Sequence, residues 1–316
     1  MDSVTVRLEP LPPDRFDSWR AAVRERLIRR RRDSGLRPGA DADEHADAII
    51  TQMHQAGAES RASAVLGILI DEVEVGTTWL SLPGERAYLI DVHAERELEP
   101  HERDDVVTLI ERLARETGAV TLSADVFLGD EETRSLLDGR GFEASSIQML
   151  LEPLPDRTDA DERVDVAPMS RERFERFAAD AERGFAEELA ATGRISFEDA
   201  AAEARRQFGV ELPDGVDTDG QQLFTAAVDS EEVGVLWLSR RVREGVPHGF
   251  ILDIAVDAAH QRRGYGRALM LAAERETRRM GAASLGLHVF GGNTAAVALY
   301  EQLGYRRVQE LVVKTL

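Results

Sequence analysis

The stretch 256–271, VDAAHQRRGYGRALML, holds residue types that suit a phosphate-containing ligand. Gly264 and Gly266 let a ligand approach the backbone closely, and the apolar run that follows predicts a helix. The first N–H groups of a helix attract anions, and three arginines add positive charge around them. These arginines are Arg262, Arg263 and Arg267. For the loop by itself, an ordinary glycine-containing turn before a helix is the alternative.

Two common nucleotide-binding patterns do not fit this stretch. A dinucleotide-binding fold needs a third glycine where Leu269 stands, and an acidic residue at the end of the next strand. The phosphate-binding loop of nucleoside triphosphatases needs Gly-Lys-Ser or Gly-Lys-Thr, and the sequence contains neither. The remaining interpretation of this loop is that it binds a pyrophosphate in another type of fold.

Two side chains on predicted strands could act as a base. An amine acceptor must lose a proton before it attacks, and the ordinary pKa of histidine makes His288 chemically suitable. Asp253 is the second candidate, and it could instead orient His288. Strand alternation predicts that Asp253 faces away from Leu252 and Ile254. A histidine that is only hydrogen-bonded within the sheet is the alternative for His288.

The elements that would position these residues follow from periodicity. In the second half an opening strand VDVAPM (164–169) precedes a helical region at 170–208, interrupted near Gly193, and two strands are expected to close the half. The remaining strands are predicted at 222–229, 232–240, 249–256 and 284–290, and the remaining helices at 266–280 and about 294–303. Asn293 suits a helix N-cap and Gly304 a helix end. This order favours an α+β fold with a central sheet flanked by helices.

The chain contains an internal repeat. TLSADVFLGDEETRSLLDGRGF (121–142) aligns without a gap with SLGLHVFGGNTAAVALYEQLGY (284–305). Upstream, EVGTTWLS aligns with EVGVLWLS, and YLIDV with FILDI, so that Asp91 matches Asp253. Three matches in order indicate a tandem duplication. The charge-rich segment LEPLPDRTDADER (151–163) is typical of a linker. We place the first domain at 1–152, the linker at 153–163 and the second domain at 164–316.

Two motifs of the second half together resemble the GNAT superfamily of N-acetyltransferases. QRRGYGRA resembles the acyl-CoA-binding motif of that family, and NTAAVALYEQLGY resembles its closing helix, with a strand between the two. The resemblance covers roughly 222–316 in detail. It implies two tandem GNAT-like domains, each a mixed, mostly antiparallel central sheet flanked by helices. It also implies an enzyme that passes an acetyl group from acetyl-CoA, a cosubstrate, directly to an amine. The tandem layout is similar to that of the mycothiol synthases, but no motif establishes that substrate.

Carried over position by position, the resemblance implies roles for individual residues. Backbone groups of Ile254 and Val256 would bind the pantetheine arm, and Tyr300 would protonate the departing thiolate. Tyr300 also lies on an apolar helical stripe with Leu299 and Leu303, so a core aromatic is the alternative. The implied acetyl-CoA contacts are Ile254, Ala255, Val256, Gln261, Arg262, Arg263, Gly264, Tyr265, Gly266, Arg267, Asn293 and Ala296. The implied catalytic residues are Tyr300, His288 and Asp253.

The first half has lost these features. Its loop reads ELEPHERDD, where His101 and Arg103 replace the two glycines. The acidic residues around them would repel a pyrophosphate. Leu137 stands in place of Tyr300, and Asp130 in place of Asn293. The arginine run 29–32 is interpreted as the solvated last turn of a helix. The first half is therefore predicted to be a degenerate GNAT-like domain that does not bind acetyl-CoA.

Composition limits the other classes of function. A net charge of −20 argues against nucleic-acid binding, and no apolar run is long enough for a membrane span. The absence of cysteine excludes a cysteinyl acyl-enzyme and thiolate metal sites, and no other metal-binding pattern is present. We expect a cytoplasmic monomer or homodimer that acts on a small-molecule or peptide amine. The alternative is a non-catalytic acyl-CoA-binding regulatory protein.

Overall fold

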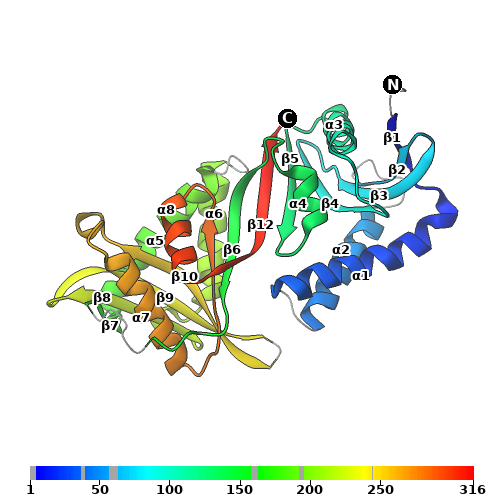
Figure 1. The fold of residues 1–316 in the computed structure, drawn as a ribbon. Helices are drawn as coiled ribbons and strands as arrows, with labels where there is room; N and C mark the ends of the chain where they lie inside the picture. Colours follow the sequence, from blue (N-terminus) through cyan, green and yellow to red (C-terminus); the bar gives the residue numbers. More distant parts are fainter. Residues whose placement is uncertain (1–4, 37–39, 57–62, 158–162, 192–195, 244) are drawn as a thin grey trace. The chain divides into compact units, whose positions relative to one another are not determined.

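The computed structural model describes the 316-residue chain except for residues 1–4, 37–39, 57–62, 158–162, 192–195 and 244 (Figure 1). It forms two compact units, each of which contains strands and helices. Unit 1 comprises Met1–Gln148, Val289–Thr294 and Arg307–Leu316, and unit 2 comprises Met149–His288 and Ala295–Arg306. The interruption that we predicted near Gly193, and part of the predicted linker, lie outside the described residues.

Unit 1 is a sheet with helices on both faces. Its strands are β1 (Val6–Pro10), β2 (Ser63–Ile70), β3 (Val73–Ser81), β4 (Arg86–Ala94), β5 (Thr121–Phe127) and β12 (Arg306–Thr315), in that spatial order. Its helices are α1 (Phe16–Ser34), α2 (Ala40–Ala56), α3 (Pro100–Glu116) and α4 (Glu131–Leu137). β4 and β5 are parallel, and the other neighbours in this order are antiparallel. Strand β6 (Glu143–Leu151) spans the boundary between the units.

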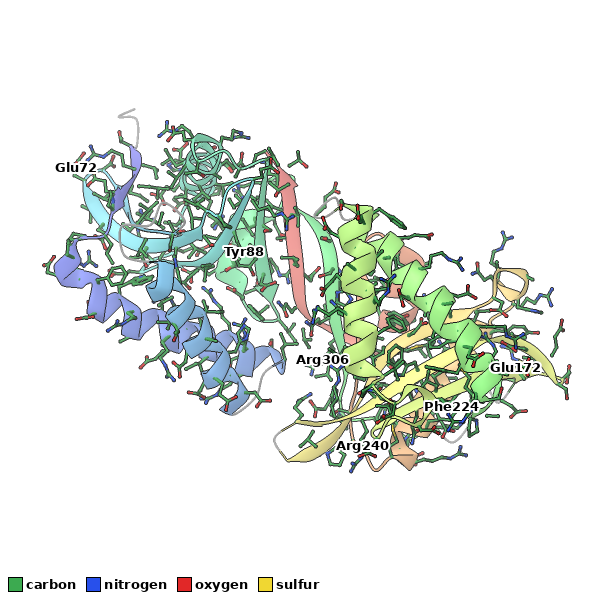
Figure 2. The ribbon with its side chains drawn as sticks, turned by 180° about the vertical axis from the view of Figure 1, so that it is seen from behind. Glu72, Tyr88, Glu172, Phe224, Arg240 and Arg306 are labelled. Atoms are coloured by element: carbon green, nitrogen blue, oxygen red, sulfur yellow. The ribbon has the colours of Figure 1, made fainter. Side chains whose placement is uncertain are left out.

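Two apolar clusters pack against the strands of unit 1. Trp79 of β3 lies under α1 and α2, where its ring meets Trp19 edge-on at 5.5 Å between centroids. Leu80, the next residue of β3, packs in the second cluster with Val106 and Ile110 of α3. Successive strand side chains point to opposite faces, so the run at 74–81 serves both clusters. Figure 2 shows the side chains, with Tyr88 on β4 in the interior of this unit.

Unit 2 repeats this architecture. Its strands are β7 (Asp165–Pro168), β8 (Gln221–Val228), β9 (Glu231–Arg243), β10 (Val246–Val256) and β11 (Leu285–Phe290), in the spatial order β11-β10-β9-β8-β7. Its helices are α5 (Arg171–Ala191), α6 (Phe197–Glu211), α7 (Tyr265–Arg279) and α8 (Thr294–Gln302). β10 and β11 are parallel and the other pairs are antiparallel. The predicted α+β class with mostly antiparallel sheets is confirmed.

The early elements of the two units correspond at a constant offset of 158 residues. Pro10 matches Pro168, and the residue after each donates its N–H to the next strand, Leu11 to Val65 and Met169 to Leu223. Trp79 and Trp237 also correspond. The ring of Phe177 on α5 meets the Trp237 ring edge-on at 6.1 Å between centroids, as the ring of Trp19 on α1 meets that of Trp79. The duplication inferred from sequence therefore extends to packing.

Two predictions need correction. After α8 the described chain forms one strand, β12, and not two, because the segment from Arg306 to Thr315 contains no Gly, Pro, Asn or Asp that would favour a turn. The arginine run at the end of α1 is not simply solvated. Arg31 is buried, and Arg30 forms ion pairs with Asp91 and Asp130. These carboxylates come from β4 and from the start of α4, distant elements that helical periodicity does not reveal.

Candidate active site

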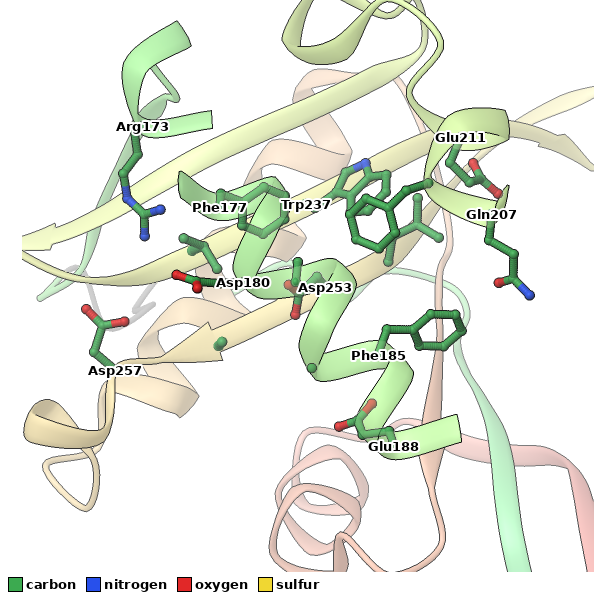
Figure 3. Close-up of a pocket in the computed structure, with 16 residues that line it drawn as sticks. Arg173, Phe177, Asp180, Phe185, Glu188, Gln207, Glu211, Trp237, Asp253 and Asp257 are labelled. Carbon is green, nitrogen blue, oxygen red and sulfur yellow. The ribbon is translucent and has the colours of Figure 1, made fainter. Parts of the chain in front are cut away.

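A pocket of about 400 Å³ lies in unit 2 where α5 and α6 cover β9 and β10 (Figure 3). Carboxylates and aromatic rings dominate its wall. The carboxylates are Asp180, Glu188, Glu211, Asp253 and Asp257, and the aromatic residues are Phe177, Phe185, Phe208 and Trp237. The Trp237 indole is held by a 2.8 Å hydrogen bond from its Nε1 to Gln221 and lies 5.4 Å from the Phe208 ring. A concave pocket that combines aromatic surface with convergent polar groups is a candidate small-molecule site.

Helix α5 contributes one face to this pocket. Its lining residues recur at the helical spacing of three and four, from Phe177 through Ala181 and Gly184 to Phe185 and Glu188. No heavy atom lies within 4 Å of the point where a Cβ of Gly184 would be. The pocket is therefore open partly because position 184 has no side chain.

Asp253 reaches the pocket through a β-bulge. The register between β9 and β10 shifts between Ile251 and Asp253, so Leu252 is the additional residue, and Asp253 lies opposite Trp237. A bulge breaks strict alternation, and both Leu252 and Asp253 line the pocket. The prediction that Asp253 faces away from Leu252 is therefore wrong. Alternation holds only where neither strand carries an extra residue.

The pocket changes the acidity of its carboxyl groups. Burial raises the pKa of Asp253 to about 6, although a hydrogen bond from the Ile254 N–H favours the charged form. Desolvation by the pocket wall, and then the charge of Asp253, raise the pKa of Glu188. At neutral pH Asp253 is therefore an ionised carboxylate that accepts a proton more readily than an ordinary aspartate does.

Tyr300 lies on α8, in the same unit, and interacts electrostatically with Asp253. The side chain is buried, and its ring packs on Tyr305 at 6.0 Å between centroids. Burial, and then the negative charge of Asp253, raise the pKa of Tyr300 to about 12. The phenol therefore keeps its proton at neutral pH and can donate it. Tyr300 is a core aromatic and a possible acid at once, so the two interpretations of its sequence pattern are compatible.

The end of β10 has a backbone edge that β11 does not cover. The parallel pairing of β10 with β11 runs from Gly249–Leu285 to Ile251–Leu287, whereas β10 continues to Val256. The N–H of Asp257 donates to Val233 of β9 at 2.9 Å, so alternation turns the peptide groups of Val256 toward the other edge. There the Val256 carbonyl accepts a 3.1 Å hydrogen bond from the Gln261 side chain. An extended ligand arm could pair with the N–H at this edge.

The loop before α7 presents backbone N–H groups to solvent. Gly264 is the N-cap of α7, in the left-handed conformation with φ of 84°, and no side chain caps the helix. Arg262 also has a positive φ, of 63°. The arginines of the loop, Arg262, Arg263 and Arg267, are exposed, as are Gln261 and Gly264, and Tyr265 and Gly266 are partly buried. This arrangement suits an anion at the helix N-terminus.

In unit 1 the corresponding helix start is closed by its own carboxylates. Glu99 is the N-cap of α3, and its side chain together with that of Glu102 forms a capping box. Glu102 accepts a 2.8 Å hydrogen bond from the Glu99 N–H and also pairs with Arg96 at 2.7 Å. The N–H groups that could bind a phosphate are therefore occupied by protein carboxylates.

The strand edge of unit 1 is occupied as well. At the offset of 162 residues that relates Asp91 to Asp253, Val92 and Ala94 correspond to Ile254 and Val256. The Val92 carbonyl accepts a 2.9 Å hydrogen bond from Arg30, and the Ala94 N–H donates to the carboxylate of Glu132. Ala295 stands at the position of Glu132 in the aligned repeat, and a methyl group cannot form this bond.

Other predicted site residues lie apart from the pocket. His288 is exposed on β11 and is not among the described residues that line the pocket. Asn293 is exposed immediately before α8 and belongs to unit 1, with its N–H bonded to the Phe290 carbonyl at 2.9 Å. Ala296 is partly buried in the first turn of α8, whereas Ala255 lines the pocket.

Sequence reasoning did not find most of the pocket wall. Its aromatic residues come from three different elements, and Glu188 had an equally good interpretation as a surface helix residue. The available signal was the α5 stripe of Phe177, Ala181 and Phe185, which interrupts a charged helix at the spacing of a buried face. That stripe predicts packing, but it does not reveal a cavity.

Comparisons with known proteins agree with this geometry. A model described as the acetyltransferase (GNAT) family matches residues 182–305. The uncharacterized N-acetyltransferase YycN of Bacillus subtilis (strain 168) is 29% identical over 152 residues, 48% of this chain and 97% of that protein. The mycothiol acetyltransferase of Nocardiopsis dassonvillei is 38% identical over 100 residues, 30% of each chain. A solved tandem GNAT protein from the clavulanic acid biosynthesis pathway aligns with 98% of this chain and 97% of its own, at 16% identity and a TM-score of 0.44.

Residues 182–305 carry a GNAT acetyltransferase domain. The family match begins within α5 and ends after α8, so it includes the loop before α7 and the pocket residues from Gly184 onward. The chain has two compact units, and most of the family match falls in the second. GNAT enzymes generally use acetyl-CoA as the acetyl donor. No helix in the described part of the chain is long and apolar enough to cross a membrane.

Proposed function

We propose that unit 2 is the active domain and that it moves an acetyl group from acetyl-CoA directly to a primary amine bound in the pocket. The observation that carries the proposal is that unit 2 places a buried carboxylate, Asp253, in the pocket wall and a protonated phenol, Tyr300, on α8, within range of the charge of Asp253. The chain has no cysteine to form a thioester with the acetyl group, which favours direct transfer.

Unit 2 offers suitable contacts for acetyl-CoA. The uncapped N-terminus of α7 and the exposed arginines before it would hold the pyrophosphate. The N–H of Val256, at the uncovered edge of β10, would pair with the pantetheine arm. When bound, acetyl-CoA supplies an activated acetyl group as a thioester.

The protein side chains would move the protons. Asp253 accepts one proton from the ammonium form of the acceptor, which frees the nitrogen lone pair for attack on the acetyl carbon. Tyr300 donates its hydroxyl proton to the departing sulfur as the carbon–sulfur bond breaks. A second proton of the acceptor nitrogen then replaces the one that Tyr300 gave. The net result is an amide, a free thiol and one proton, which Asp253 passes to solvent.

Unit 1 is proposed to be inactive. Its aspartate at the matching position, Asp91, is fully buried and forms ion pairs with Arg26 and Arg30, so it is not available as a base. The carboxylates of Glu102 and Glu132 occupy the N–H groups that acetyl-CoA would need. We therefore expect one acetyl-CoA to bind per chain.

The test is Tyr300→Phe, assayed by thiol release with acetyl-CoA and a panel of amines. Phe keeps the ring packing against Tyr305 and removes the proton donor. We expect kcat to fall on the order of 100-fold, a typical loss for a general acid, with the acetyl-CoA Kd unchanged. Tyr305→Phe is the matched control, because it removes a buried phenol from the same unit that packs on the Tyr300 ring.

Two results would contradict the proposal. Unchanged kcat in Tyr300→Phe would exclude the assigned acid. Calorimetry that finds two acetyl-CoA molecules per chain would contradict the assignment of unit 1 as inactive. His288→Asn in the same assay tests the other predicted base, and a loss larger than that of Asp253→Asn would transfer the role to His288.

A further inference from the structure

Unit 1 shows which groups can pair with a carboxylate at the position that corresponds to Asp253. Asp91, its counterpart, receives the guanidinium of Arg26 at 2.6 Å and that of Arg30 at 3.0 Å, and its side chain has no solvent exposure. The fold at this bulge therefore accommodates a carboxylate together with a cationic nitrogen that enters from the first helix of the unit.

Unit 2 lacks those arginines. At the offset of 158 residues that matches Trp79 with Trp237, the positions of Arg26 and Arg30 are taken by Gly184 and Glu188. The change removes two long side chains and replaces one positive charge by a negative charge. Gly184 and Glu188, which stand at the positions of the two arginines, line the pocket together with Asp253. Asp253 remains in unit 2, but α5 carries no arginine at the two positions that correspond to Arg26 and Arg30.

The rest of the wall fits an organic cation with an apolar body. Trp237 and Phe208 present aromatic rings, which attract cations through their faces and bury apolar groups. Arg173 is the one cationic side chain among the described residues of the wall, and its guanidinium already pairs with Glu232. An acceptor with its own carboxylate would meet the negative charges of Asp253 and Glu188 and find no free partner.

We propose that the acceptor is a cationic primary amine with an aromatic or apolar body and no carboxylate, and that Gly184 is the residue that admits it. The ammonium group takes the place of the arginine guanidinium of unit 1 against the aspartate. This inference rests on the proposed function, since it names the substrate class of the same site.

The first experiment compares tryptamine with tryptophan and tyramine with tyrosine, pairs that differ only in the carboxylate. Acetylation is followed by thiol release, and binding is measured separately by quenching of tryptophan fluorescence for the tyramine pair. We expect kcat/KM for each amine to exceed that of its amino acid at least about 10-fold. Equal or better turnover of the amino acids would overturn the inference, and the enzyme would remain an acetyltransferase.

The second experiment restores the arginine with Gly184→Arg. The new guanidinium should pair with Asp253 and fill the pocket, so tyramine binding and turnover should fall on the order of 100-fold while the acetyl-CoA Kd stays within about 3-fold. Gly209→Arg, at an exposed glycine of α6 with no atom near its Cβ position, is the matched control and should behave as wild type. Gly184→Ala keeps most of the space and tests whether the helix tolerates a side chain.

The two failures are distinguishable. Tyramine turnover in Gly184→Arg equal to wild type would refute the role of Gly184 and of the pocket while acetyl transfer itself persists. Absence of acetyl transfer from wild type to every amine, with acetyl-CoA bound, would refute the proposed function instead. Loss of acetyl-CoA binding in Gly184→Arg but not in Gly184→Ala would assign position 184 to the donor site and overturn the inference.

Discussion

Replacement of Asp253 by Asn should stabilise the protein at neutral pH and impair catalysis. Asn is nearly the same size and keeps a polar group in the pocket, but it carries no charge. The wild-type carboxylate is ionised at neutral pH in a place that disfavours the charge, since burial raises its pKa to about 6. The substitution therefore removes a group that is unfavourable for folding and necessary for the proposed proton transfer.

The magnitude follows from the shift. The pKa of Asp253 is about 6 in the folded protein, whereas the ordinary value for an aspartate is 3.8, and this difference corresponds to at most about 3 kcal/mol. Because the folded-state pKa is raised, this group favours the folded state at low pH, and that contribution is lost as pH rises through about 6. Between pH 4.5 and 7.5 the wild type should lose about 2 kcal/mol that Asp253→Asn does not lose.

Urea unfolding at pH 4.5 and 7.5 measures this difference. The free energy of unfolding of Asp253→Asn minus that of wild type should be larger at pH 7.5 by about 2 kcal/mol. Asp219→Asn, at an exposed turn of unit 2, controls for the loss of one negative charge. A difference that is independent of pH, or larger at pH 4.5, would refute the raised pKa.

Asp253→Asn should also change the pH dependence of catalysis. Wild-type kcat/KM should decline as pH falls below about 6, because protonated Asp253 cannot accept the proton of the acceptor. Asp253→Asn should lose on the order of 100-fold in kcat and lack this limb of the pH profile. Unchanged activity would exclude Asp253 as the base.

Two further predictions concern the duplicated features. Gly264→Glu should abolish acetyl-CoA binding in calorimetry, because it adds strain at a φ of 84° and a negative charge at the helix N-terminus. Gly281→Glu is the matched control, because Gly281 follows α7 with a similar φ of 73°. Retained affinity in Gly264→Glu would reject the phosphate assignment. Arg26→Ala should cost on the order of 3 kcal/mol in urea unfolding, because it leaves buried Asp91 with fewer partners. Arg20→Ala removes the partner of exposed Asp17 from a partly buried position of α1 and should cost less than about 1 kcal/mol. An equal cost for both variants would contradict the buried pair.

The local elements of the site could be predicted from sequence. The glycine loop, the helix after it and the end of α8, two residues before Gly304, depend on residues within a few positions of one another. The matching aspartates of the two halves also stand in aligned segments. Strand alternation failed at Leu252, because the bulge depends on the pairing of β10 with β9 and leaves no periodic signal.

The sequence by itself determined the duplication, the fold class and the contrast between one glycine loop and one acidic loop, since all three are patterns of neighbouring residues. Tertiary structure decided what each aspartate faces. Arg26 and Asp91 are 65 positions apart, and only the packing of α1 on β4 brings them together. In unit 2 the same packing brings Gly184 to Asp253 and leaves a cavity. A missing side chain has no pattern in sequence, and its effect depends entirely on which atoms surround it.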